Sequence, residues 1–164
     1  MGSNRSDLQM RVEQLVQKDI ASAGRETPVR DIAETMFNRS VGSVVVVDDG
    51  TPVGIVTDRD LTVELLAEDG PVNLFETDVD LESITATDVM TADPLVVSVD
   101  DQLPHVLHHM DEAHARRIPV VNEEDELVGI LTLDDVIVHL AGESAHVAAQ
   151  LDNITSVIRS AFPK

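Results

Sequence analysis

The chain has 164 residues, of which 43% are apolar but only 2% aromatic, and it contains no cysteine. This length suits one compact domain with an aliphatic core, and the missing thiols exclude disulfides and cysteine-ligated metal sites. Asp and Glu outnumber Lys and Arg by 31 to 11, for a net charge of −20. Nucleic acid and anionic membranes are therefore disfavoured as partners, because both repel a strongly negative surface.

The charge balance also indicates where the protein works. An acidic, lysine-poor composition suits concentrated salt, because ions screen the repulsion between carboxylates. We therefore expect a halophilic archaeon as the source. No apolar run is long enough to cross a membrane, and no signal-peptide pattern opens the chain. On these grounds we expect a cytoplasmic protein.

A helix is predicted over about 6–20, because Leu8, Val12, Leu15 and Val16 recur at helical spacing. With Met1-Gly2-Ser3, interpreted as a tag remnant, it forms an N-terminal segment of residues 1–24. Residues 21–26 are at best a weak strand. A second helix follows over 27–38, where Thr27 and Pro28 take the N-cap and N1 positions.

Two strands are predicted over 44–47 and 53–56, separated by the turn residues Asp48-Asp49-Gly50. Thr57 then stands where its hydroxyl can cap a helix that continues through 61–66. An acidic linker follows and includes Asp69-Gly70-Pro71.

The same order of elements returns after the linker. We predict a strand, a helix, two strands and a helix at 94–99, 100–113, 118–121, 128–131 and 136–140. A last helix over about 143–161 has an apolar stripe of Val147, Leu151, Ile154 and Ile158. It lies within a C-terminal segment of residues 142–164.

The two halves are copies of one unit. GIVTDRDL (54–61) matches GILTLDDV (129–136), and the strands before them match as well. Each β-α-β-β-α unit leaves an apolar face that its partner can cover. We therefore expect an α/β (α+β) fold of two repeats packed with pseudo-twofold symmetry and flanked by N- and C-terminal helices.

These residues resemble a tandem pair of cystathionine-β-synthase-type (CBS) domains, a Bateman module. The likeness rests on GSVVVVDDGTPVGIVTDRDL (42–61), DVMTADPLVVSVDD (88–101) and RRIPVVNEEDELVGILTLDDV (116–136). It places repeat 1 at 25–70, the linker at 71–85 and repeat 2 at 86–141. The resemblance implies a stand-alone, non-catalytic regulatory sensor that forms homodimers and acts on a regulated protein. Its two clefts would bind AMP, ADP, ATP or S-adenosylmethionine, and it requires no cofactor.

In such domains the Thr contacts phosphate and the Asp three residues later holds the ribose hydroxyls. The resemblance therefore assigns Thr57 and Asp60 to one cleft, and Thr132 and Asp135 to the other. An ionised carboxylate accepts two hydroxyl donors, and a helix N-terminus favours an anion. The same spacing is also that of an ordinary capping box, and the two roles are compatible.

Basic residues stand out against so many carboxylates. Arg59 lies beside one presumed phosphate position, with Leu133 taken as its counterpart, and Arg116 and Arg117 precede the other repeat's first hairpin strand. Their alternative role is pairing with surface carboxylates. The resemblance further assigns apolar residues to the two base pockets: Val44 in the first, and Val97, Val99, Ile118 and Pro119 in the second. We expect the second cleft to be the better formed, because its leading strand is clearer and it has the paired arginines Arg116 and Arg117.

Four histidines, His105, His108, His109 and His114, lie within ten residues. His105 and His109 could share a metal across one helix turn, although a polar helix face explains them as well, and we assign no metal site. No catalytic motif is present. Two alternatives to a nucleotide sensor stay open: a structural or dimerisation module with empty clefts, and a metal-responsive regulator using these histidines.

Overall fold

The computed structural model describes residues 10–66 and 80–142, and its first sheet has the strand order β1-β2-β3-β4. β1 (Ser22–Gly24) is parallel to β2 (Ser43–Asp48), which forms an antiparallel hairpin with β3 (Thr51–Thr57). Alternate residues of β3 are buried, as expected for a strand with one covered face. The remaining elements of this unit are β4 (Thr91–Ala92), α1 (Val29–Arg39), α2 (Asp58–Leu66) and α3 (Ala86–Val89).

The second sheet repeats the arrangement with the order β5-β6-β7. β5 (Val97–Ser98) is parallel to β6 (Arg117–Val121), and β6 is antiparallel to β7 (Leu127–Thr132). Its helices are α4 (Leu103–Glu112) and α5 (Leu133–Gly142). The predicted repeat of elements and the mixed fold class are thus confirmed.

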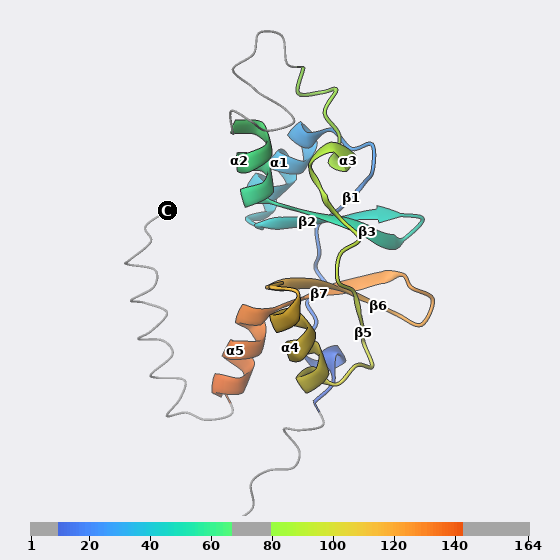
Figure 1. Ribbon diagram of the computed structural model, residues 1–164, viewed down its shortest axis with the longest axis vertical. Coiled ribbons are helices and arrows are strands. Elements are labelled where there is room, and N and C mark those ends of the chain that lie inside the picture. Colours follow the sequence, from blue (N-terminus) through green and yellow to red (C-terminus); the bar gives the residue numbers. More distant parts are fainter. Residues whose placement is uncertain (1–9, 67–79, 143–164) are drawn as a thin grey trace, which may run out of the picture.

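The two sheets lie in the middle of the molecule, with the helices on their outer sides (Figure 1). The Leu127 amide donates to the Gly50 carbonyl at 2.8 Å and joins the second unit to the hairpin turn of the first. Each unit has its own aliphatic core: Val44, Val46 and Val56 are central in one, and Ile118, Val120 and Leu131 in the other. None of the described residues belongs to a helix that is long and apolar enough to cross a membrane.

Each core is completed by a segment from the other half of the chain. Residues 10–17 pack on the second unit, where Val12 and Leu15 are buried and Gln17 pairs with Ile130 of β7. Residues 84–92 pack on the first unit, where Ile84, Ala86 and Val89 are buried and β4 pairs with β3. Each unit in space therefore combines one repeat with a short segment from the other half of the chain.

The packing of residues 10–17 on the second unit shows that the predicted N-terminal helix is wrong over the described residues. Between residues 10 and 20 the structure has only a 3-10 turn, η2 (Val12–Gln14), followed by extended chain. The backbone of Gln17 pairs with Ile130 instead of continuing a helix. The expected C-terminal helix over 143–161 and most of the acidic linker lie outside the described residues.

The leading strands also differ from expectation. The first unit, predicted to have the weaker one, has a three-residue β1, whereas β5 covers only two residues of the predicted 94–99. Strand completeness therefore gives no reason to rank the second cleft above the first.

Candidate functional site

Both Thr-x-x-Asp pairs lie where the last hairpin strand of a unit meets its final helix. The Asp60 amide donates to Thr57 Oγ1 at 3.1 Å, and the Thr57 amide donates to Asp60 Oδ2 at 2.8 Å. In the second unit the Asp135 amide donates to Thr132 Oγ1 at 3.1 Å, and the Thr132 hydroxyl donates to Asp135 Oδ2. All four side chains are half-buried. The expected capping function is therefore present in both copies.

A narrow cleft of about 130 Å³ contains Thr132 and draws its walls from both units. Thr132, Ile130 and Arg117 come from the second unit. The first unit contributes the chain before β1 and the start of β2, with residues Ile20, Ala21, Val41, Gly42, Ser43 and Val45. Gln17 and Asp19 complete the cleft. One face is thus apolar and the other carries a hydroxyl and a guanidinium.

Arg117 and Arg116 also line an adjoining hollow of about 200 Å³ with Thr132 and Asp134. Arg116 is paired with Asp134 at 3.4 Å, and both side chains are more than 70% exposed. Arg117 forms none of the ion pairs found among the described residues. A bound anion could therefore use Arg117 directly, whereas Arg116 already has a carboxylate partner.

The helix N-terminus itself offers little to an anion. In α5 the Leu133 amide donates to the Arg116 carbonyl at 2.9 Å, and the Asp135 amide is used by Thr132. In α2 the Asp58 amide donates in the same way to the Gly42 carbonyl at 3.1 Å. Arginine side chains, more than backbone amides, therefore supply the positive charge here.

The expectation that Leu133 is the counterpart of Arg59 is wrong by one residue. With Thr57 matched to Thr132, Arg59 falls opposite Asp134 and Asp58 falls opposite Leu133. The first unit thus has a basic side chain where the second has an acidic one. Arg59 is exposed on the first turn of α2.

Several residues assigned to the base pockets lie elsewhere. Val44, Val97 and Ile118 are buried in the two cores, because alternate strand residues face the helices. Val99 packs at the edge of the second core. Pro119 is buried but belongs to neither core cluster, like its counterpart Val45, which does line the cleft.

Sequence reasoning missed the residues that form the apolar wall. It sought that wall within the repeat that carries the Thr and Asp, whereas Ile20, Ala21 and Val41 come from the other repeat. The pseudo-twofold packing brings these residues together, and no local pattern in the sequence indicates it.

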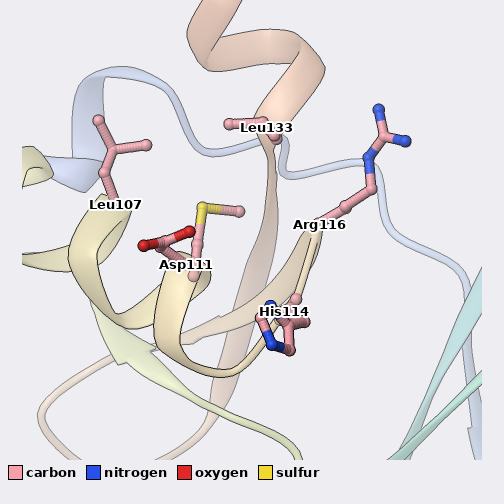
Figure 2. Close-up of a pocket in the computed structure, with 7 residues that line it drawn as sticks. Leu107, Asp111, His114, Arg116 and Leu133 are labelled. Atoms are coloured by element: carbon pink, nitrogen blue, oxygen red, sulfur yellow. The ribbon is translucent and has the colours of Figure 1, made fainter.

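A separate cavity of about 390 Å³ lies on the helical side of the second unit. Figure 2 shows Leu107 and Asp111 on α4, His114 in the following turn and Leu133 at the start of α5, with the Arg116 side chain pointing away. Met110 and Ala115 also line it. Of the four histidines only His114 borders this cavity. Over residues 10–66 and 80–142, no group of three or more His, Asp or Glu is arranged to hold a metal.

Comparison with known proteins identifies the repeat. The family model described as "CBS domain" matches residues 12–67 and 86–142. The uncharacterized protein YlbB of Bacillus subtilis is 41% identical over 66% of this chain and 67% of its own length. The CBS domain-containing protein YhcV of the same organism is 28% identical over 88% of this chain and 94% of its own.

Some matched relatives are longer. The chain spans 60% of an uncharacterized protein of Methanopyrus kandleri, with 25% identity over 77% of this chain. Among solved structures, CBSX2 in complex with AMP aligns with a TM-score of 0.65 and 29% identity, covering 82% of this chain and 97% of that one.

The fold of the CBS domain pair of protein MJ0100, solved with 5'-methylthioadenosine and S-adenosyl-L-methionine, aligns with a TM-score of 0.67 at 21% identity, over 82% of this chain and 98% of that one. The two matched repeats, the two similar sheets and these relatives lead to one conclusion: the chain belongs to the CBS domain family as a tandem pair.

Proposed function

We propose that this CBS pair is a non-catalytic regulatory sensor, acting in the cytoplasm, that binds an adenine nucleotide or adenosyl compound. The observation that carries the proposal is the cleft that joins Thr132 and Arg117 of one unit to the apolar wall of the other. The complex of CBSX2 with AMP supports it, because that protein is similar over most of both chains.

Each part of such a ligand has a chemical match in this cleft or directly beside it. Ile20, Ala21 and Val45 offer an apolar surface for a base. Asp135 does not line the cleft, but its carboxylate is hydrogen-bonded to Gln17 and Thr132, which do. This carboxylate suits a pair of ribose hydroxyls, since it only accepts hydrogen bonds. Arg117 and the Thr132 hydroxyl suit a phosphate. A ligand held this way touches both units and would favour one arrangement of them over another, which is how binding could reach a regulated protein.

The related site of the first unit has Thr57, Asp60 and Arg59. Arg59 lies between Asp58 and Asp60 on the first turn of α2, whereas Arg117 borders a cleft together with Thr132 and an apolar wall. On this ground we favour the second cleft as the primary site and AMP as the first ligand to test, with ADP, ATP and S-adenosylmethionine as alternatives.

Isothermal titration with AMP, ADP, ATP, S-adenosylmethionine and NAD tests the proposal. We expect saturable binding of at least one adenine compound. Folded protein that gives no heat at millimolar ligand would contradict it and favour the structural alternative. A shift of the unfolding temperature by Zn²⁺ or Ni²⁺, without nucleotide binding, would favour the histidine-based regulator.

We also propose that the protein is a homodimer in which α1 of each copy contacts α4 and α5 of the other. Phe37 on α1 is 84% exposed, and α5 exposes Ile137, Val138 and Leu140. The α4 cavity of Figure 2, lined by Leu107, Met110 and Leu133, has the apolar walls that such a ring requires. In a dimer with a twofold axis, Phe37 of each copy would enter this cavity of the other copy. The same contact then forms twice, and the assembly stops at two copies.

A further inference from the structure

Gln17 is the residue by which the exchanged N-terminal segment reaches the candidate ligand. It lines the cleft of Thr132, and its Nε2 donates to Asp135 Oδ1 at 2.8 Å. The other oxygen of that carboxylate accepts the Thr132 hydroxyl. Both oxygens of Asp135 are therefore engaged before any ligand is bound.

The backbone of Gln17 fixes this arrangement. Its amide donates to the Ile130 carbonyl at 2.9 Å, and its carbonyl accepts from the Ile130 amide at 3.0 Å. Two backbone bonds to the middle of β7 hold the Cα of Gln17 in place, whereas its side chain is exposed and can rotate. The side-chain amide can thus leave Asp135 without any movement of the segment.

The first unit lacks this contact. Thr91 pairs with Ile55 as Gln17 pairs with Ile130, so the two residues hold equivalent positions. A threonine side chain is shorter than that of glutamine, and within the described residues no hydrogen bond joins Thr91 to Asp60. Asp60 Oδ2 accepts the Thr57 backbone amide instead. The contact is therefore specific to the second cleft.

We propose that Gln17 is an internal competitor for the ribose-binding carboxylate and sets the affinity of the second cleft. A vicinal diol that approaches Asp135 from the cleft meets the Gln17 amide at Oδ1 and competes with it for that oxygen. The size of the cleft agrees with this: about 130 Å³ is below the roughly 300 Å³ at which small-molecule pockets begin. Rotation of Gln17 both frees the oxygen and widens the cleft. This inference rests on the proposed function of the site.

A competitor and a residue that merely orients Asp135 predict opposite results. If Gln17 competes, Gln17→Ala removes a bond that the ligand must break, and AMP binds more tightly, by about 2- to 12-fold for one ordinary hydrogen bond. If Gln17 orients the carboxylate, the same change weakens binding. Thr91→Ala, the equivalent change in the first unit, is the matched control and should leave binding at the second cleft unchanged.

The experiment is isothermal titration of AMP into the wild-type chain, Gln17→Ala and Thr91→Ala, with folding checked by thermal unfolding. NMR gives a second measurement, since the Gln17 side-chain amide signals, identified by their loss in Gln17→Ala, should shift as AMP binds. Tighter binding by Gln17→Ala with shifting amide signals supports the inference. Equal or weaker binding by Gln17→Ala, with wild-type binding intact, overturns this inference alone. If neither protein binds AMP, the inference is overturned for AMP, and the proposed function fails as well only if ADP, ATP and S-adenosylmethionine also do not bind.

Discussion

The Gln17 carbonyl lies 2.7 Å from the point where a Cβ on Gly129 would stand. Gly129 is the first residue of the repeated GILTLDDV motif, and a side chain there would also strike Val16. The glycine therefore allows the exchanged N-terminal segment to cross β7. Gly54, its counterpart in GIVTDRDL, leaves room in the same way for Met90 of the other exchanged segment.

The two glycines should nevertheless differ in their tolerance of alanine. At Gly129 the new methyl group meets backbone that is hydrogen-bonded to Ile130, so Gly129→Ala should destabilise the fold by about 1–3 kcal/mol. At Gly54 it meets the flexible side chain of Met90, which can move, so Gly54→Ala should cost less. Urea unfolding of both variants measures the difference, and equal losses would contradict the role assigned to the crossing segment.

The sequence predicts the hairpins and helix caps of this fold but not the path of residues 10–17. The hairpins and the caps at Thr57 and Thr132 follow from local alternation and spacing, and the structure contains them. The segment 10–17 could not be predicted in this way. Val12, Leu15 and Val16 have helical spacing, but backbone pairing of Gln17 with β7 outweighs that weak local preference.

For the candidate site, too, the local motif predicts some residues, and the packing of the two repeats determines the others. Thr132 and Asp135 could be named from the motif at the strand-to-helix junction, and Arg117 from its position at the start of the first hairpin strand. The apolar wall of Ile20 and Ala21 could not, because it depends on which repeat faces which. The resemblance assigned Val44 and Ile118 to the base pockets, whereas both are buried in the cores. A buried valine run has no polar alternation to mark which side of the strand faces the cleft.

Asp135→Ala should weaken AMP binding by about 1–3 kcal/mol, because it removes charge-assisted hydrogen bonds to the ribose. It should also lower the free energy of unfolding, since the carboxylate no longer accepts hydrogen bonds from the Thr132 hydroxyl and the Gln17 side chain. Titration and urea unfolding separate the two effects. Asp60→Ala removes the corresponding carboxylate of the first unit, which accepts the Thr57 amide, and serves as the control. If Asp60→Ala weakens the tightest binding event and Asp135→Ala does not, the first cleft is the primary site.

Arg117→Ala tests the phosphate position. We expect it to weaken AMP binding about tenfold or more, as for a hydrogen bond to a charged group, and to leave adenosine binding unchanged because adenosine has no phosphate. Arg116→Ala should have a smaller effect, since Arg116 is paired with Asp134 and exposed. An equal loss for AMP and adenosine would show that Arg117 shapes the cleft instead of binding the phosphate.

Phe37→Ser should convert the proposed dimer to a monomer, because it removes the large apolar side chain that α1 exposes for the contact. Leu81→Ser is the control: Leu81 is also apolar and 36% exposed, but it lies outside the helices. Sedimentation velocity over a range of protein concentrations gives the mass of each variant. A wild-type chain that is monomeric throughout, or a Phe37→Ser variant that stays dimeric, would contradict the proposed interface.

Salt should stabilise this protein against unfolding. The carboxylates behind its net charge of −20 lie closest together, and repel one another most, in the folded state. The Debye length, over which salt leaves this repulsion effective, falls from ~10 Å at 0.1 M to ~3 Å at 1 M salt. We therefore expect the urea midpoint to rise steadily with KCl over this range. Sucrose strengthens apolar burial without screening charge. It therefore distinguishes charge screening by KCl from a general stabilisation by added solute. A midpoint that rises equally with sucrose, or not at all with KCl, would argue against the predicted adaptation to salt.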